Sequence, residues 1–141
     1  MKKLITTTLL ILLVLLTSCS NNKLNPNPTD VDSIIIDSQG TFTQEQCTER
    51  NLQDKVIMIK SKYCGHCVET LPDFKKAASF HNLDPMIIET TKDEDLEILK
   101  SYNIDFVYTP TFIVGCDYFI GAKSFQGYDR IFEDFKESQT N

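Results

Sequence analysis

The segment KVIMIKSKYCGHC, residues 55–67, decides the expected fold. Its first part, Lys55–Lys60, contains an apolar run of strand length, which is typical of a strand buried in the centre of a sheet. After it, apolar side chains recur at helical spacing between Cys64 and about Phe80; the positions are Cys67, Leu71, Phe74 and Ala78. Two cysteines separated by two residues therefore stand where a central strand ends and a helix begins.

Strands and helices alternate on both sides of this segment. We expect strands at Ser33–Asp37, Met86–Glu89, Thr111–Val114 and Tyr118–Ile120, and helices at Thr43–Asn51, Asp93–Tyr102 and around Phe125–Phe135. The aromatic stripe of the last helix is interpreted as core. This order predicts an α/β fold with a mixed central sheet and helices on both faces.

Composition and charge exclude some classes of protein. The chain has 141 residues, of which 41% are hydrophobic, and its 14 basic against 20 acidic residues give a net charge of −6. This length and composition predict one modest domain. Nucleic-acid binding needs clustered basic residues to neutralise phosphates, and the chain has no such cluster.

The first residues are interpreted as a targeting signal. A basic start, Met1-Lys2-Lys3, precedes an apolar run to Leu16 that is too short to span a membrane. The run ends in LTSC, which resembles the lipobox of bacterial lipoproteins. That resemblance implies cleavage after residue 18 and a lipid on Cys19; the alternative is an ordinary cleaved signal with a chance cysteine.

The resulting organisation has three parts. Residues 1–18 form the signal, residues 19–32 the lipidated cysteine and a polar, proline-containing tether, and residues 33–141 the folded domain. We therefore expect a location in the cell envelope, on the extracytoplasmic face of a membrane. The lipid provides the membrane contact, since more than one acyl chain anchors a protein durably.

The cysteine pair carries the chemistry. Cys64 falls at a helix N-terminus, where unpaired N–H groups and the helix dipole favour the thiolate, the form that attacks disulfides. Cys67 lies about one helical turn further on, placed to resolve a mixed disulfide on Cys64. His66, when protonated, adds positive charge beside the thiolate and favours an oxidising couple.

Together with a second motif, this pair resembles the thioredoxin superfamily. KSKYCGHC is followed by YTPTFIV, and Pro72 falls where thioredoxins carry a proline inside the helix. The likeness covers about residues 33–138. It implies that Pro110 is cis and packs against the cysteines, and that Thr109 offers backbone hydrogen bonds to a substrate chain. By the same resemblance, Tyr63 and Gly65 belong to the substrate-binding surface.

The sequence combines features of several branches and departs from others. CGHC and the threonine before Pro110 resemble protein disulfide isomerases, whereas SKYC and Gly121-Ala122 resemble glutaredoxin-like members. Met58 occupies the position where thioredoxins carry a buried acidic residue that relays a proton. Tyr63 replaces the usual tryptophan.

Two further cysteines, Cys47 and Cys116, have two interpretations. In an exported protein spare cysteines often pair. In the fold implied by the resemblance, the first helix and the turn at Cys116 approach the same end of the domain, away from Cys64. The alternative is two buried thiols, which are common core residues. His81 is expected to be a solvated residue at a helix C-terminus.

The expected function is a membrane-anchored thiol–disulfide oxidoreductase. Its substrates would be cysteine-containing exported proteins, with an envelope redox partner, no bound cofactor and a monomeric state. We expect an oxidase or isomerase; the first alternative is a reductase for envelope or cytochrome maturation. A second is a copper- or zinc-binding lipoprotein using Cys64, His66 and Cys67, although structural zinc sites usually need four ligands. A third is an inert scaffold.

Overall fold

The computed structural model describes residues 32–140. Contacts divide the chain into two units, and residues 31–141 make up the second. The expected signal, the lipid site Cys19 and the tether up to residue 31 lie outside the described residues.

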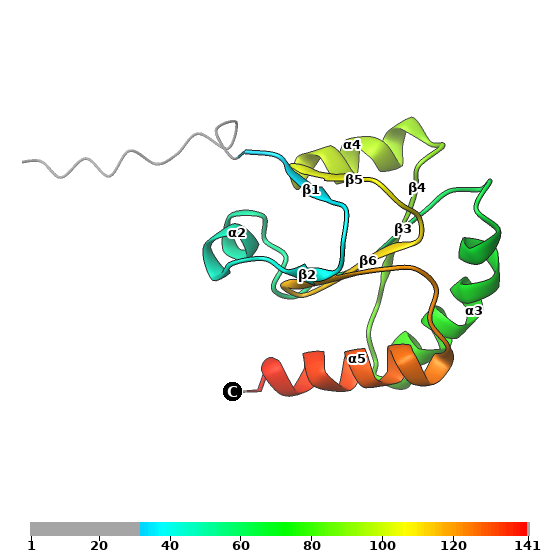
Figure 1. The fold of residues 1–141 in the computed structure, drawn as a ribbon. Coiled ribbons are helices and arrows are strands. Elements are labelled where there is room, and N and C mark those ends of the chain that lie inside the picture. The colour runs from blue at the N-terminus through cyan, green and yellow to red at the C-terminus, as the bar shows by residue number, and fades with distance from the viewer. Residues whose placement is uncertain (1–31, 141) are drawn as a thin grey trace, which may run out of the picture. The chain divides into compact units, whose positions relative to one another are not determined.

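A five-stranded mixed sheet forms the centre of the domain (Figure 1). Its order is β2-β7-β6-β3-β4, in which β3 and β4 are parallel and the other pairs antiparallel. The strands are β2 (Gly40–Thr41), β3 (Val56–Lys60), β4 (Met86–Glu89), β6 (Thr111–Val114) and β7 (Asp117–Ile120). A second, parallel pair joins β1 (Ile34–Ile36) to β5 (Ile104–Phe106). The expected mixed α/β architecture is confirmed.

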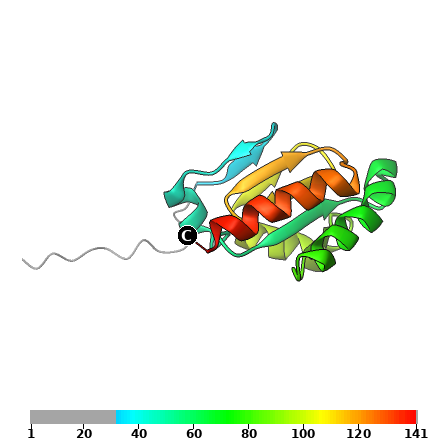
Figure 2. The same cartoon turned by 90° about the horizontal axis from the view of Figure 1, so that it is seen from below.

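Helices cover both faces of the sheet, as expected (Figures 1 and 2). They are α2 (Gln44–Glu49), α3 (Gly65–Phe80), α4 (Asp93–Ser101) and α5 (Phe125–Ser138). Helices α3 and α5 pack together on one face, whereas α2 and α4 contribute to the core on the other. Pro72 lies inside α3.

The apolar run of β3 is explained by burial on both sides. Val56 and Met58 belong to the core beneath α3 and α5, whereas Ile57 and Ile59 belong to the opposite core. Side chains alternate between the faces of a strand, so a strand covered on both faces is apolar at every position. This places β3, and the loop that follows it, at the middle of the sheet.

The last helix buries its aromatic stripe. Tyr128, Phe132 and Phe135 are buried against α3 and the sheet, and Phe125 and Ile131 pack around them. The interpretation of this stripe as core is confirmed. Ser124 caps the helix by accepting a hydrogen bond from the N–H of Gly127.

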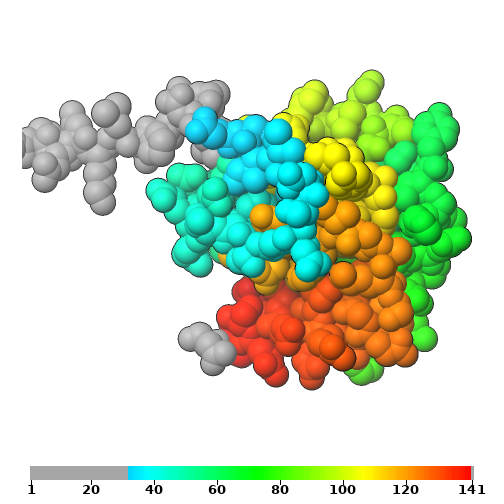
Figure 3. All heavy atoms as spheres, viewed as in Figure 1, coloured from blue at the N-terminus to red at the C-terminus, as the bar shows by residue number. Residues whose placement is uncertain are grey.

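Two short strands were not expected from the sequence. Gly40, which lies outside the strands expected from the sequence, pairs in β2 with Tyr118 of β7, and β5 pairs with β1. Figure 3 shows the segment of β1 and β2 at the surface beside the strands with which they pair. Both pairings join residues more than 65 positions apart, so the local periodicity of the sequence does not predict them.

Candidate functional site

The expected junction of strand and helix is present at the cysteine pair. Strand β3 ends at Lys60, and Cys64 is the N-cap residue of α3. The Sγ atom of Cys64 accepts a hydrogen bond from the backbone N–H of Cys67 at 3.1 Å. A donor in this position stabilises negative charge on the sulfur, as helix N-termini generally do.

The two cysteines lie at disulfide distance but differ in their access to solvent. Their Cα atoms are 5.2 Å apart and the structure joins their sulfurs. Cys67 is fully buried in the core beneath α3 and α5, whereas Cys64 is only partly buried. An incoming sulfur from another molecule therefore reaches Cys64 and not Cys67.

The second motif lies directly beside the first. The carbonyl oxygen of Thr109 is 3.4 Å from the Sγ atom of Cys64. The bond between Thr109 and Pro110 is cis, and Pro110 is buried. Antiparallel pairing of Ile59 with Thr111 brings the two motifs together from opposite ends of adjacent strands.

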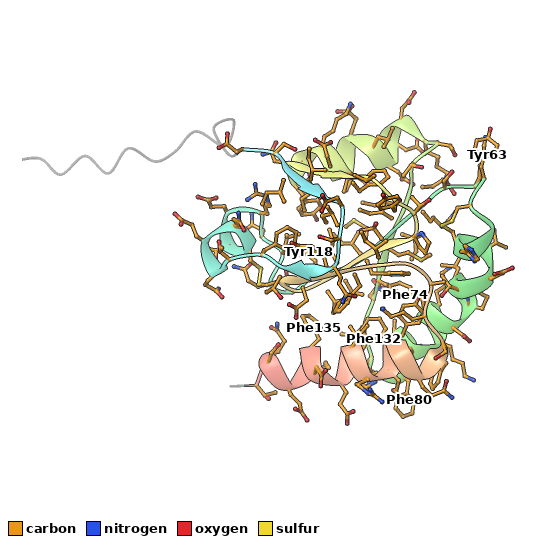
Figure 4. The ribbon with its side chains drawn as sticks, viewed as in Figure 1. Tyr63, Phe74, Phe80, Tyr118, Phe132 and Phe135 are labelled. Atoms are coloured by element: carbon orange, nitrogen blue, oxygen red, sulfur yellow. A yellow bond between two sulfur atoms is a disulfide. The ribbon has the colours of Figure 1, made fainter. Side chains whose placement is uncertain are left out.

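Exposed apolar side chains lie on the two segments that meet at Cys64 and Thr109. Tyr63 is 81% exposed and projects from the corner of the molecule in Figure 4. Val68 is exposed on the first turns of α3, and Val107 and Tyr108 are exposed on the segment before Thr109. The sequence analysis did not identify Val107 and Tyr108 as candidate substrate-binding residues. Their position directly before Thr109 and Pro110 was the signal that could have identified them.

Gly65 and His66 both face outward. A Cβ atom at Gly65 would meet no atom within 4 Å, so this position borders open space beside Cys64. The His66 side chain is 81% exposed, and its Nδ1 atom lies 3.4 Å from a carboxylate oxygen of Glu69. The contact of the imidazole is thus with a carboxylate on the same helix rather than with a cysteine sulfur.

Beneath the cysteines, Met58 is fully buried and apolar. A charged pair lies instead at the strand ends, where Lys60 of β3 contacts Glu89 of β4. Burial alone would raise the pKa of Glu89, but contacts with Lys60, the N–H of Lys62 and the Thr91 hydroxyl hold that pKa below its usual range. Sequence reasoning missed this pair because its members are 29 residues apart.

Cys47 and Cys116 are also at disulfide distance. Their sulfurs are 1.99 Å apart and their Cα atoms 5.4 Å apart. Cys47 is fully buried on α2, and Cys116 occupies the turn between β6 and β7. A surface hollow of about 470 Å³ lies at this end of the domain, lined in part by Cys116, Phe119 and Phe135.

The expectation for His81 is wrong. Its side chain is only 15% exposed, and Nε2 lies 2.8 Å from a carboxylate oxygen of Asp129 on α5. The residue does cap the C-terminus of α3, but the packing of α5 against that helix covers most of its side chain. The sequence of α3 alone does not show which helix will cover its end.

The described residues hold neither a metal site nor a membrane-spanning helix. Within residues 32–140, no group of three or more His, Cys, Asp and Glu side chains is arranged to hold a metal ion. In the same part of the chain, no helix has the length and apolar character needed to cross a membrane. The sequence matches no protein-family model and no curated protein.

Proposed function

We propose that this protein is a thiol–disulfide oxidoreductase that uses Cys64 as the nucleophile and Cys67 as the resolving cysteine. The observation that carries the proposal is the unequal burial of a CXXC pair at a helix N-terminus. Cys64 is accessible and its sulfur is hydrogen-bonded by the Cys67 N–H, whereas Cys67 is fully buried. An accessible attacking sulfur and a protected resolving sulfur are what disulfide exchange needs.

The oxidising reaction has two displacements. A thiolate of the substrate attacks Sγ of Cys64, the Cys64–Cys67 disulfide breaks, and the Cys67 thiolate that leaves takes up a proton. A second substrate thiolate then attacks the substrate sulfur bound to Cys64. The substrate disulfide forms and Cys64 leaves as a thiolate, so two electrons and one proton pass to the cysteine pair, and the second proton of the substrate thiols is released to solvent. Reduction of a substrate is the reverse.

The proposed substrate is an extended segment of an exported protein. Tyr63, Val107 and Tyr108 offer exposed apolar surface, which suits a chain that is not yet folded. Gly65 leaves space next to Cys64, and the Thr109 backbone lies within 3.4 Å of the reacting sulfur. Tyr63 and Gly65 adjoin Cys64 in the chain, and Val107 and Tyr108 directly precede Thr109.

A thioredoxin-like fold is part of the proposal. It is supported by the mixed sheet, by helices on both faces and by a buried proline beside the cysteine pair. The β1–β5 pair and strand β2 are additions to the architecture expected from the sequence.

Anchoring by a lipid at Cys19 remains a proposal based on the LTSC sequence. Strand β1, where the described chain begins, lies on the side of the domain away from Tyr63 (Figures 1 and 4). A chain tethered at that end leaves Cys64 free to meet substrates in the envelope.

We propose that the enzyme acts as an oxidase or isomerase. The position of His66 between the two cysteines supports this direction, because a protonated imidazole there would add positive charge near Cys64 and make the disulfide more oxidising, although Glu69 contacts the ring and offsets part of that charge. The reduction potential of the Cys64–Cys67 couple decides it. A value clearly above about −270 mV, the thioredoxin value, is expected; a value at or below it would indicate a reductase.

Two activity assays test the proposal on the full chain. The protein should accelerate the refolding of reduced ribonuclease or the reduction of insulin by a small thiol. Cys64→Ser should abolish both activities, and Cys67→Ser should accumulate a mixed disulfide with the substrate. The matched control is the double variant Cys47→Ser/Cys116→Ser, which should keep the activity. A parent chain inactive in both assays would refute the proposal.

A further inference from the structure

Glu89 is a buried carboxylate that the disulfide exchange described above does not use. Its side chain is 10% exposed, and it is one of only four buried polar or charged residues among those the structure describes. It ends β4 directly opposite Lys60, which ends β3. The loop that carries Cys64 begins immediately after Lys60.

The carboxylate of Glu89 is fully engaged by this loop and its surroundings. One oxygen contacts the ammonium group of Lys60. The other accepts the backbone N–H of Lys62 at 2.8 Å and the Thr91 hydroxyl at 3.2 Å. The backbone N–H of Glu89 donates to Asp95 on α4 at 2.8 Å, which holds the strand end itself in place.

Lys62 is the first residue of this loop whose backbone N–H is hydrogen-bonded to another element, the end of β4. Further along, the N–H groups of Tyr63 and Cys64 donate to the hydroxyl and carbonyl oxygens of Ser61, each at 3.2 Å. These two bonds stay within the loop and do not attach it to the sheet. The hydrogen bond between Lys62 and Glu89 does, because Glu89 belongs to β4.

We propose that Glu89 is a positioning residue for Cys64. By holding the N–H of Lys62, it sets the path of residues 61–63 and keeps the Cys64 sulfur against the first turn of α3. The positioning of Cys64 by Glu89 does not depend on the proposed function. Only the catalytic purpose of that positioning rests on it. A loop released from Glu89 lets the sulfur leave the Cys67 N–H, and the thiolate loses the partner that stabilises it.

A purely structural role makes a different prediction. If the Lys60–Glu89 pair only joined β3 to β4, its loss would lower stability and leave the acidity of Cys64 unchanged. Removing one charge alone would confuse the comparison, since it strands the other charge in a buried position. Both variants below therefore carry Lys60→Met.

The experiment compares Glu89→Gln with Glu89→Met in the full chain with Lys60→Met. Glutamine and methionine have similar size and no charge, but only glutamine keeps an oxygen that can accept the N–H of Lys62. The measurement is the pH profile of Cys64 alkylation by iodoacetamide, in a Cys67→Ser background. We expect the methionine variant to show at least about threefold less thiolate at pH 7, which is about half a pKa unit.

Two controls accompany the comparison. Glu97→Met removes an exposed carboxylate that pairs with Lys100, and it should leave the profile unchanged. Amide hydrogen exchange at Lys62 reports the anchor directly. It should be slow in the parent and the glutamine variant, and at least about tenfold faster in the methionine variant.

Equal alkylation profiles in the glutamine and methionine variants would overturn the inference, whatever their melting temperatures. Failure of the proposed function has another signature, namely a parent Cys64 with the acidity of a free cysteine and no disulfide exchange activity. In that case the exchange of the Lys62 amide still decides whether Glu89 holds the loop. Equal exchange in both variants would refute the anchor.

Discussion

The Cys64 sulfur lies 3.4 Å from the carbonyl oxygen of Thr109, although the two residues are 45 positions apart. The contact follows from the pairing of β3 with β6, which aligns Ile59 with Thr111. One residue pair thus joins the two motifs into one site. The carbonyl oxygen can accept a hydrogen bond from a thiol, whereas the Cys67 N–H favours the thiolate, so the two neighbours act on the sulfur in opposite directions.

The reduced cysteines should differ in reactivity because they differ in burial. Iodoacetamide should modify Cys64 first, with an apparent pKa below the value near 8.5 of a free cysteine, because the Cys67 N–H stabilises the thiolate. Cys67 should react only under conditions that unfold the chain, since it is fully buried. Peptide mapping after a short pulse of reagent measures both. Equal labelling of the two residues would contradict this prediction.

Tyr63 should contribute to substrate binding rather than to the chemistry of the sulfur. Because it is 81% exposed, Tyr63→Ser should leave stability and the Cys64 alkylation profile nearly unchanged. We expect a several-fold higher KM for an unfolded protein substrate. Phe80→Ser is the matched control, because Phe80 is 70% exposed at the far end of α3. An equal rise in KM in both variants would indicate non-specific binding of the substrate to exposed apolar side chains.

The Cys47–Cys116 bond should stabilise the fold without taking part in catalysis. It closes a loop with a sequence separation of 69 residues, for which chain entropy predicts about 4 kcal/mol of stabilisation. Urea unfolding of Cys47→Ala/Cys116→Ala should show a loss of that order, with disulfide exchange activity retained. An unchanged midpoint would mean that these cysteines are not bonded in the protein.

Glu89 should make stability sensitive to acid. Its pKa is lowered in the folded state, so its stabilising effect is fully present above the unfolded value near 4.3 and is lost as the pH falls through the folded pKa. Urea midpoints of the parent should decrease across this acidic range. The Lys60→Met/Glu89→Gln variant should give a flatter curve, whereas Glu97→Gln should follow the parent.

Tyr128 should make stability sensitive to alkali. Burial raises its pKa above the usual value, although its hydrogen bonds with Thr70 and the N–H of Lys123 act in the opposite direction. The folded state therefore holds this proton when the unfolded chain has lost it, and stability falls as the pH rises above about 10.

Tyr128→Phe removes that dependence and leaves the Lys123 N–H without its partner, at a cost of about 1–3 kcal/mol at pH 7. Unfolding measured from pH 7 to 11 checks both effects. Tyr63→Phe is the control, since the exposed Tyr63 should change neither the midpoint nor its pH dependence.

Local pattern was enough to predict most helices and strands. The Met86–Glu89 strand has exactly the bounds expected, and α3 begins one residue after the expected Cys64. The small differences arise at caps. Thr43, expected inside the first helix, is its N-cap and forms a capping box with Gln46. Such ends depend on individual hydrogen bonds rather than on periodicity.

The site was predictable where its residues belong to a recognisable motif. Cys64, Gly65, His66 and Cys67 follow from CGHC, and Thr109 and Pro110 were expected beside them from the resemblance of YTPTFIV. The outward direction of His66 and the burial of His81 did not follow, because both depend on which surfaces the other elements cover. Tyr108 opens the YTPTFIV motif, but the exposure of Val107 and Tyr108 depends on which surfaces the other elements leave uncovered.

The sequence by itself determined the alternation of strands and helices, the double burial of β3 and the place of a cysteine at the start of α3. These features depend on side-chain periodicity and on hydrogen bonds within a few residues. The tertiary structure alone decided that Cys67 is enclosed and that Glu89 accepts the N–H of Lys62. Each of these requires residues far apart in the chain to meet, and that depends on how the strands pair.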